Sequence, residues 1–290
     1  MAMRVPVKLS HCIFSNNTTA TSGAVFLKYG AVEVINCLFS SNNSTDDAGA
    51  LYYYGTSLKV VNSTFVGNRA TDASKAQGGA IALFSDANVT SNIELSNSIL
   101  WGNTAAKEAG QVYALNDIQI QLTSNIIQGG RADILIGARA AVNYTTDAAT
   151  DASDTDPLFE DAAAEDYHLK SNSPAIDAGN DDKATGITTD LSGKTRKDGT
   201  AVDLGVYEYD PTATSINAAS TTSETLHYDA ATKTLHVNRA GIAQDVLSIY
   251  LVNGRLLRNK NLNDTIIYVG DLPSGIYIVK VANAVMKLAL

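Results

Sequence analysis

Apolar and polar residues alternate in short blocks that recur along the first half of the chain. The blocks read VKLSHCIF from Val7, VEVINCLF from Val32, LKVVNSTF from Leu58, IELSNSIL from Ile93 and IQIQLTSN from Ile118. A period of two turns one side chain inward and the next outward, so each block predicts a β-strand rather than a helix. Recurrence every 25–35 residues, over about five repeats, predicts a solenoid with one coil per repeat.

Two sets of residues hold equivalent positions in these blocks. If the coils stack, strands of successive coils lie ~4.8 Å apart and each side chain sits above its equivalent. Apolar members of such a column would fill the interior. Asparagines at a repeated corner would hydrogen-bond along the stack and tolerate left-handed backbone. The apolar column is Phe14, Phe39, Phe65 and Leu100, and the asparagine column is Asn17, Asn42, Asn68 and Asn103.

A second landmark lies between the blocks, in the strings SGAVF, AGALY, GGAIA and AGQVY. Their glycines, Gly23, Gly49, Gly79 and Gly110, predict corners with positive φ. Together the patterns predict an all-β chain whose residues 1–145 form a parallel β-helix. Its right hand is taken from the usual chirality of parallel crossovers. The chain enters this pattern almost at once, so we expect further coils upstream.

The paired landmarks resemble the GGA(I/L/V) and FxxN repeats of the chlamydial polymorphic membrane proteins and of many bacterial surface β-helices. The matching residues are Gly79, Ala80 and Ile81 for the first repeat, and Phe14/Asn17, Phe39/Asn42 and Phe65/Asn68 for the second. The resemblance covers about the first half of the chain. It implies an architecture but no activity, since such helices serve adhesins and polysaccharide lyases alike.

Residues 146–210 differ in charge from the rest, with 5 basic and 16 acidic side chains, a balance of -11. The string DPLF…YHLKSNSPAIDAGN…DLSGKTR…VDLGVYEY resembles a segment near the C-terminal end of many secreted β-helix proteins, sometimes called a choice-of-anchor domain. An open end of a β-helix exposes unpaired strands and needs a cap. We therefore expect this segment to form the last coils and cap, with 173–177 and 203–207 as strands. Arg196 would pair with Asp177, Asp190 or Asp203.

A calcium site is the alternative interpretation of the same segment. Carboxylate and amide oxygens on glycine-rich loops are the ligands that Ca²⁺ prefers. No DxDxDG spacing is present, and solvated aspartates are the simpler explanation. The candidate ligands are Asp177, Asn180, Asp181, Asp182 and Asp190.

Cys12 and Cys37 hold equivalent positions in consecutive coils and should be stacked neighbours. Adjacent strands approach the Cα separation that a disulfide permits, ~4.4–6.8 Å, but in-register neighbours point the same way. Free, buried thiols are therefore the favoured interpretation, with a disulfide as the alternative. Metal binding is disfavoured because no CxxC or CxxH partner exists.

After a short linker at 211–214, residues 216–290 predict about seven short strands and a small β-sandwich. The strings IYLVNGRLL, VGDLPSGIYIVKV and MKLAL resemble the C-terminal sorting domain of type IX secretion cargo in Bacteroidetes. The terminal Lys-Leu-Ala-Leu departs modestly from that pattern. The resemblance implies export across the outer membrane and a location on the cell surface or outside the cell. The matching residues are Gly254, Leu272, Pro273, Gly275, Tyr277 and Lys287.

Candidate chemistry on the coils is sparse. Tyr52, Tyr53 and Tyr54 form an aromatic run in which alternation should expose at least one ring, and such a ring could stack on a sugar. No column of Lys, Arg and acidic residues converges as polysaccharide lyases require, and Asp46/Asp47 reads as turn chemistry. His11 and His168 lack an evident Ser or Cys partner. Two functions stay open: an adhesin-like or glycan-binding scaffold, and a calcium-assisted polysaccharide lyase or glycosidase.

Net charge removes one class of partner. The chain carries a formal charge of -9 with an estimated pI of 4.8, whereas binding nucleic acid requires a basic face. No apolar run approaches the ~20 residues of a membrane-spanning helix. The expected partners come from the resemblances and the exposed aromatic run. They are a polysaccharide or cell-surface glycan and, through the C-terminal residues, the secretion machinery.

Overall fold

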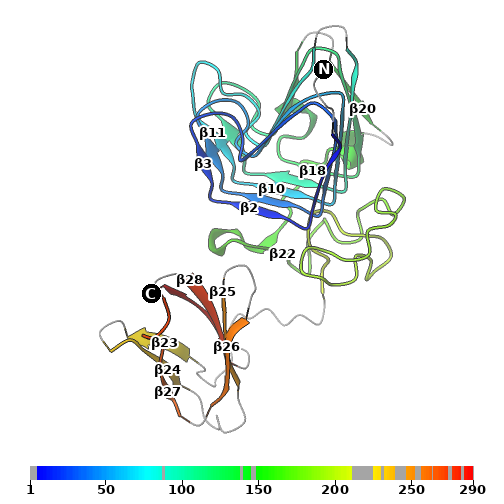
Figure 1. The fold of residues 1–290 in the computed structure, drawn as a ribbon. Coiled ribbons are helices and arrows are strands. Elements are labelled where there is room, and N and C mark those ends of the chain that lie inside the picture. The colour runs from blue at the N-terminus through cyan, green and yellow to red at the C-terminus, as the bar shows by residue number, and fades with distance from the viewer. Residues whose placement is uncertain are drawn as a thin grey trace. The chain divides into compact units, whose positions relative to one another are not determined.

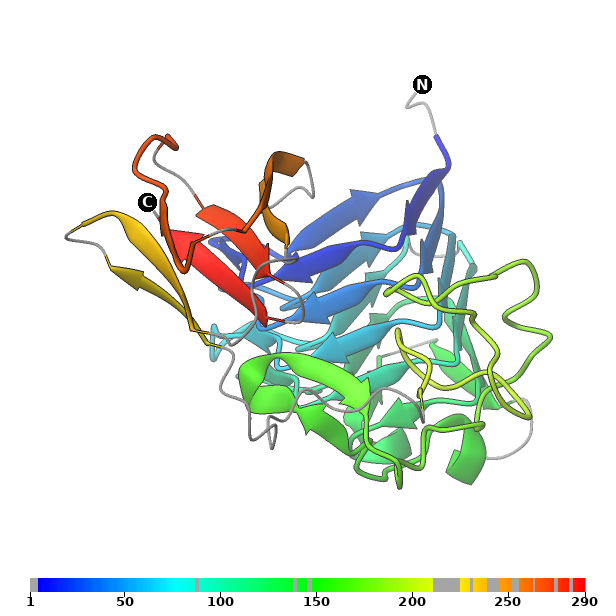
Figure 2. The same cartoon turned by 90° about the horizontal axis from the view of Figure 1, so that it is seen from below.

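The computed structural model describes residues 5–86, 89–137, 140–144, 148–210, 225–229, 232–238, 246–251, 256–262, 264–273, 276–281 and 284–289. The chain divides into two compact units, Met1–Thr212 and Ala213–Leu290. The first is a parallel β-solenoid and the second a smaller antiparallel β unit, which confirms the predicted fold class (Figures 1 and 2).

Four parallel sheets run along the solenoid, and each of the first four coils contributes one strand to each sheet. Figure 1 shows the strands of successive coils lying one behind another. Sheet A contains β1 (Val7–Ser10), β5 (Ala31–Ile35), β9 (Ser57–Val61), β13 (Ser91–Ser96), β17 (Ile118–Thr123) and β20 (Ala141–Tyr144). Sheet B contains β2 (Ile13–Ser15), β6 (Leu38–Ser40), β10 (Thr64–Val66), β14 (Ile99–Trp101) and β18 (Ile126–Ile127).

The two remaining sheets complete each coil. Sheet C is short, with β3 (Thr18–Thr19), β7 (Asn43–Ser44), β11 (Arg69–Ala70) and β15 (Thr104–Ala105). Sheet D contains β4 (Val25–Lys28), β8 (Leu51–Tyr54), β12 (Ile81–Phe84), β16 (Val112–Leu115) and β19 (Ile134–Ile136). A short 3-10 helix, Gly130–Asp133, precedes β19.

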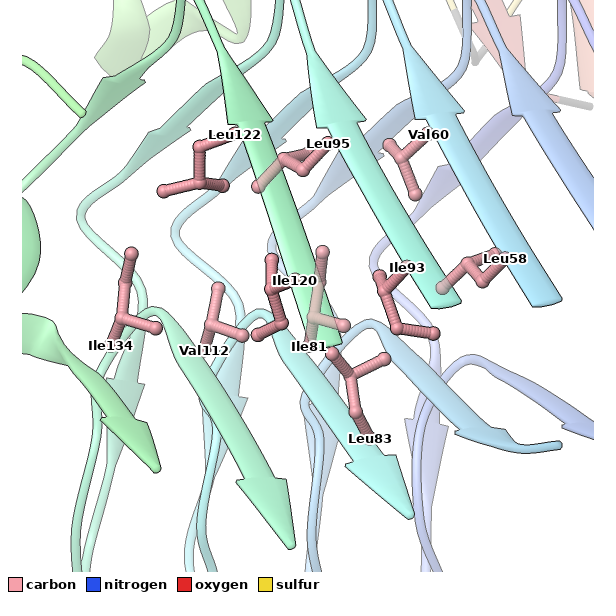
Figure 3. Close-up of a pocket in the computed structure, with 10 residues that line it drawn as sticks. All are labelled: Leu58, Val60, Ile81, Leu83, Ile93, Leu95, Val112, Ile120, Leu122 and Ile134. Carbon is pink, nitrogen blue, oxygen red and sulfur yellow. The ribbon is translucent and has the colours of Figure 1, made fainter. Parts of the chain in front are cut away.

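The predicted apolar column lies in register inside the solenoid. Phe14, Phe39 and Phe65 are direct partners on β2, β6 and β10. Their rings stack with centroids 4.9 and 4.6 Å apart. Facing side chains of sheets A and D fill the rest of the interior, as Figure 3 shows for ten of them, and leave a space of only about 10 Å³. That volume holds at most one water, so this interior is a packed core and not a ligand site.

The predicted asparagine column forms a buried ladder of hydrogen bonds. The side-chain Nδ2 of Asn17 donates to Oδ1 of Asn42, Asn42 donates to Asn68, and Asn68 donates to Asn103, each over 2.8 Å. The same Nδ2 atoms of Asn42 and Asn68 also donate to the backbone oxygens of the phenylalanine column. One amide therefore ties each coil to the one before it and to the one after it.

Two details of the predicted corners are wrong. The ladder asparagines do not have left-handed backbone; the residues before them do, such as Asn16 at φ 56° and Gly67 at φ 63°. Gly49, Gly79 and Gly110 likewise lack the predicted positive φ, which falls instead on the preceding residue, as at Gly78 with φ 68°. Gly79 is needed for space, because a Cβ there would lie 2.5 Å from the backbone oxygen of Gly110.

Cys12 and Cys37 are both free, as favoured from the sequence. Each thiol donates to a backbone oxygen two residues earlier, at 3.4 Å to Ser10 and 3.3 Å to Ile35. Burial raises the pKa of Cys37 to about 12. In the following coils Ser63 and Ser98 occupy the same column, and their hydroxyls accept the backbone N–H of the residue stacked one coil earlier.

Only the start of the acidic segment continues the stack as predicted: Ser153 forms a parallel bridge with Ile126 of β18, and its backbone N–H donates to the backbone oxygen of Asn125. Helix α1 (Ala148–Asp151) and Ala152 pack on the last coil, where Ala152 joins the interior core. From Asp156 onward the chain instead lies along the side of sheet B, as Figure 2 shows. Residues 173–177 and 203–207, predicted as strands, form turns and irregular backbone. The only regular elements described there are β21 (Phe159–Asp161), a 3-10 helix at Ala162–Ala164, and β22 (Asp166–Leu169).

Three asparagines at one corner of the solenoid hold this side segment, which we define as residues 156–210. Asn36, Asn62 and Asn97 share left-handed backbone at φ 49°, 48° and 50°. Their Nδ2 atoms donate to the backbone oxygens of Thr189 (2.6 Å), Asp203 (3.2 Å) and Asn180 (2.9 Å), respectively. An apolar cluster with members such as Leu38, Ile99, Phe159, Tyr167 and Leu204 seals the same interface.

The second unit contains two antiparallel sheets around one core. The first sheet contains β23 (Thr225–Asp229), β24 (Thr234–Asn238) and β27 (Ile266–Tyr268). The second contains β26 (Leu256–Asn261), β25 (Val246–Leu251), β28 (Ile276–Val281) and β29 (Ala284–Ala289). Leu235 and Val237 from the first sheet pack with Leu247, Ile249 and Val279 from the second.

Breaking the asparagine ladder should destabilise the solenoid. We expect Asn68→Ala to lower the free energy of unfolding by roughly 1–3 kcal/mol, because buried partners in two neighbouring coils lose their hydrogen bonds. The exposed Asn143, replaced by Ala, is the matched control and should change it by less than ~0.5 kcal/mol. Urea unfolding followed by circular dichroism measures both, and equal midpoints for the two variants would contradict a structural role of the ladder.

Candidate functional site

A groove of about 440 Å³ runs across the outer face of sheet A. Its floor is built by alternation, because the inward side chains of each strand fill the core and leave the polar neighbours outside. Five successive strands contribute, and the lining includes Glu33, Lys59, Asn92, Glu94, Gln119, Gln121 and Asn143. From the sequence, only Lys59 among these was considered, as one of the scattered basic residues of the coils. The recurring polar positions of the strands were the signal for the others.

The side segment borders this groove. Asn97, at the end of sheet A, both donates to the backbone oxygen of Asn180 and accepts the backbone N–H of the same residue, at 2.9 and 2.8 Å. Three residues later, Lys183 Nζ lies 3.0 Å from Glu94 Oε1, a groove residue. The next outward positions of sheet A, such as Val61 and Ser96, are fully buried. The side segment therefore meets the groove at Glu94, whereas the lining of the groove itself comes from sheet A.

The three candidate tyrosines do not form one surface. Tyr53 points into the core, is 0 % exposed and donates its hydroxyl hydrogen to backbone oxygen, so no ligand reaches it. Tyr52 and Tyr54 point outward from sheet D and are half-buried. The expectation that alternation exposes at least one ring is met, but the surroundings of these rings decide what they can bind.

Tyr52 has both ring faces covered. It stacks on Phe26 with centroids 4.6 Å apart and on Phe84 with centroids 5.0 Å apart, at interplanar angles of 9° and 21°. A sugar stacks on the face of an aromatic ring, and these faces are already used by other rings. Tyr52 is thus part of an external aromatic ladder that packs the outside of sheet D.

Tyr54 is fixed by polar contacts at the corner that leads into sheet A. Its hydroxyl donates to the carboxylate of Asp86, and this bond raises the pKa of Tyr54 to about 12. Lys28 Nζ lies 4.9 Å from the centre of the ring, and the Tyr29 ring meets it edge-on at 5.8 Å. Of the three tyrosines, Tyr54 retains the best position for a ligand, and binding there stays a prediction.

The predicted calcium ligands are engaged in holding the side segment together. Asp190 is fully buried and accepts the backbone N–H groups of Lys194 and Glu208. Asp177 accepts from the backbone of Ala201. Asp181 accepts from the backbone of Val202 and forms an ion pair with Lys197.

The remaining two predicted ligands do not join them in a cage. Asn180 contacts Asn97 through its backbone, and Asp182 is exposed. Across the described ranges, no group of three or more His, Cys, Asp or Glu is placed to hold a metal ion. Calcium binding stays a prediction without a geometric basis in these residues.

Arg196 lies at the centre of the side segment and is 1 % exposed. Its Nη2 lies 2.8 Å from Glu208 Oε1 and donates to the backbone oxygen of Asp203. The predicted partners Asp190 and Asp203 are nearby and act on it through charge, but the direct carboxylate partner is Glu208. One cation thus faces three buried carboxylates, and burial raises the pKa of Glu208 to about 7.

The two histidines also have structural surroundings. His11 Nε2 lies 3.3 Å from the backbone oxygen of Thr189, at the corner that holds the side segment. His168 Nδ1 lies 2.6 Å from Asp166 Oδ1, and its ring stacks on Tyr207 at 4.0 Å. Asp47 accepts the backbone N–H of Gln77 in the next coil, which agrees with turn chemistry.

Two residues of the sorting-type motif, Pro273 and Tyr277, are joined by a hydrogen bond in the second unit. Tyr277 is 2 % exposed, and its hydroxyl donates to the backbone oxygen of Pro273 over 2.5 Å. Leu272 packs against the core of this unit. Lys287 is on β29, paired with Ile278, whereas Gly254 and Gly275 are outside the described residues.

Comparison with protein-family models, with curated proteins and with solved structures found no match. In the part of the chain that the structure describes, no helix is long and apolar enough to span a membrane.

Protonation of Glu208 should stabilise the first unit. Its pKa in the folded protein, about 7, is above the ordinary 4.5, so the native state binds this proton more tightly than the unfolded chain. The stabilisation is complete below pH 4.5 and is lost as the pH rises through 7. We expect Glu208→Gln to flatten the dependence of the free energy of unfolding on pH between these values.

Urea unfolding at a series of pH values measures this slope. Asp198→Asn, which removes an exposed carboxylate of the same segment, is the matched control and should keep the wild-type slope. A Glu208→Gln protein with the wild-type slope would contradict the assignment.

Proposed function

We propose that this protein is a secreted or cell-surface β-helix scaffold, adhesin-like in architecture, that binds a glycan in the groove on sheet A. The groove carries this proposal, because it is open, about 440 Å³ in volume and lined by polar side chains from five successive strands. A repeating row of hydrogen-bonding groups suits a ligand that repeats along its own length. The resemblance of the coils to bacterial surface β-helices supports the same function.

The charges in the groove favour binding over catalysis. Glu33 Oε2 lies 3.5 Å from Lys8 Nζ, and Glu94 Oε1 lies 3.0 Å from Lys183 Nζ. Glycosidases need one carboxyl that holds a proton near neutral pH and a second that stays ionised. Here each acid is already engaged by a lysine, and Lys59 stands between the two acids in the register of sheet A. The calcium-assisted lyase or glycosidase stays the alternative hypothesis.

We further propose that the second unit directs export by type IX secretion. The support is the resemblance of Leu272-Pro273…Tyr277 to the sorting motif, together with the hydrogen bond that Tyr277 donates to the backbone oxygen of Pro273. A compact, separately packed unit at the C-terminal end of the chain suits an address that the secretion machinery recognises.

Glycan binding can be tested with the purified full chain on a panel of immobilised polysaccharides. We expect retention on at least one of them, and Gln121→Leu together with Asn143→Leu should reduce retention by about tenfold, since each lost hydrogen bond contributes about 1 kcal/mol. Thr18→Val, on the opposite short sheet C, is the matched control. Release of unsaturated ends from a uronic-acid polysaccharide would instead establish the lyase alternative.

The sorting role can be tested in a bacterium that has type IX secretion. Full-length protein should reach the cell surface, and a chain lacking residues 213–290 should accumulate inside the outer membrane. Immunoblots of cell fractions and protease treatment of intact cells distinguish the two locations. Equal surface exposure of both chains would overturn the role of the second unit.

A further inference from the structure

The groove floor carries two columns of outward side chains with different chemistry. One column runs in register through Lys8, Glu33, Lys59, Glu94, Gln121 and Asn143. The second runs through Ala31, Ser57, Asn92, Gln119 and Ala141. The first column is charged over four strands and then turns to amides, whereas the second carries no charge at all.

Both glutamates of the charged column form ion pairs, one within the column and one with the side segment. Glu33 is paired with Lys8, and Glu94 is paired with Lys183 of the side segment. Lys59 is the register partner of both Glu33 and Glu94. An anionic sugar brought to Lys59 would therefore meet a carboxylate on each neighbouring strand, ~4.8 Å away. Lys59 is thus the one cation of this column without an ion pair among the described residues, and the carboxylates on both neighbouring strands offset its attraction for an acidic glycan.

Two neighbouring amides provide the free recognition groups. Asn92 and Gln119 are direct register partners on β13 and β17, the first exposed and the second half-buried. Within the described residues, neither side chain makes a hydrogen bond. Each amide offers two N–H donors and one carbonyl acceptor, which matches a sugar hydroxyl that both donates and accepts.

The spacing of these groups sets the direction of the ligand. Strands of successive coils lie ~4.8 Å apart, which is close to the length of one pyranose unit in an extended chain. A polysaccharide lying along the stack would place successive sugars over successive strands. The hydroxyl of Ser57, which precedes Asn92 in the same column, extends this row of uncharged groups.

We infer that the sheet A groove binds an uncharged polysaccharide that lies along the solenoid stack, with the Asn92 and Gln119 amides as the residues that determine specificity. This inference rests on the proposed glycan-binding function and names its substrate class. Recognition is by hydrogen bonds to hydroxyl groups, so affinity is insensitive to salt, in contrast to binding of a charged chain.

Affinity electrophoresis of the full chain in gels containing a neutral or an acidic polysaccharide tests the inference. The neutral panel consists of a mannan, a xyloglucan and a β-glucan, and the acidic panel of polygalacturonate and alginate, each at low and high sodium chloride. Three variants accompany the wild type: Asn92→Ala with Gln119→Ala, Lys59→Gln, and Asn259→Ala with Asn261→Ala. The last pair removes two exposed strand amides from the second unit and is the matched control. Circular dichroism and the unfolding midpoint confirm that every variant is folded.

We expect retardation by a neutral polysaccharide that salt does not change. Asn92→Ala with Gln119→Ala should weaken it at least about tenfold, whereas the control pair in the second unit should leave it near the wild-type value. Salt-sensitive retardation by an acidic polysaccharide, abolished by Lys59→Gln, would overturn the inference and leave glycan binding intact. Neutral binding that survives loss of both amides would also overturn it. Failure to bind any polysaccharide of either class would overturn the proposed function itself.

Discussion

Hydrogen bonding between stacked coils is the interaction on which the structure of the first unit depends. No single coil can bury its apolar side chains, because two-residue and three-residue strands enclose nothing by themselves. Parallel pairing places equivalent residues in register, and the register then forms the phenylalanine stack, the asparagine ladder and the polar columns of the groove. The Asn42 amide illustrates the economy of the arrangement, since it contacts Asn17, Asn68 and the backbone of Phe14.

The repeated features were predictable from the sequence because the same residue type recurs at the same position in several blocks. Phe39 and Phe65 recur at the same place in their blocks, and only a stacked arrangement gives such recurrence a physical reason. Alternation also explains why Tyr53 is buried while Tyr52 and Tyr54 point outward. What alternation could not give is the surroundings: the rings that cover Tyr52 come from the coils before and after it.

The side segment was placed wrongly because it occurs once. Residues 173–177 and 203–207 were expected to be strands of the last coils, but apolar side chains there, such as Ala175 and Leu204, pack against the outside of sheet B. The signal for its true position was in the coils, where an asparagine recurs before Cys37, Ser63 and Ser98. Those asparagines are buried and donate hydrogen bonds to backbone oxygens of the side segment. The sequence of the coils alone does not show where these acceptors come from. The partner of one groove residue was missed for the same reason, because the Lys183 that meets Glu94 belongs to this segment.

The three corner asparagines have a mechanical consequence. A solenoid pulled from one end would normally unfold one coil at a time, since each coil contacts only its neighbours. Here a single continuous strip of chain is fastened to three coils by Asn36, Asn62 and Asn97, and it reaches back toward the first coil at His11. A force that displaces one of these coils is therefore transmitted to the other two through the side segment. Mechanical load on the solenoid would therefore be shared among three coils, and unfolding one coil at a time would meet greater resistance.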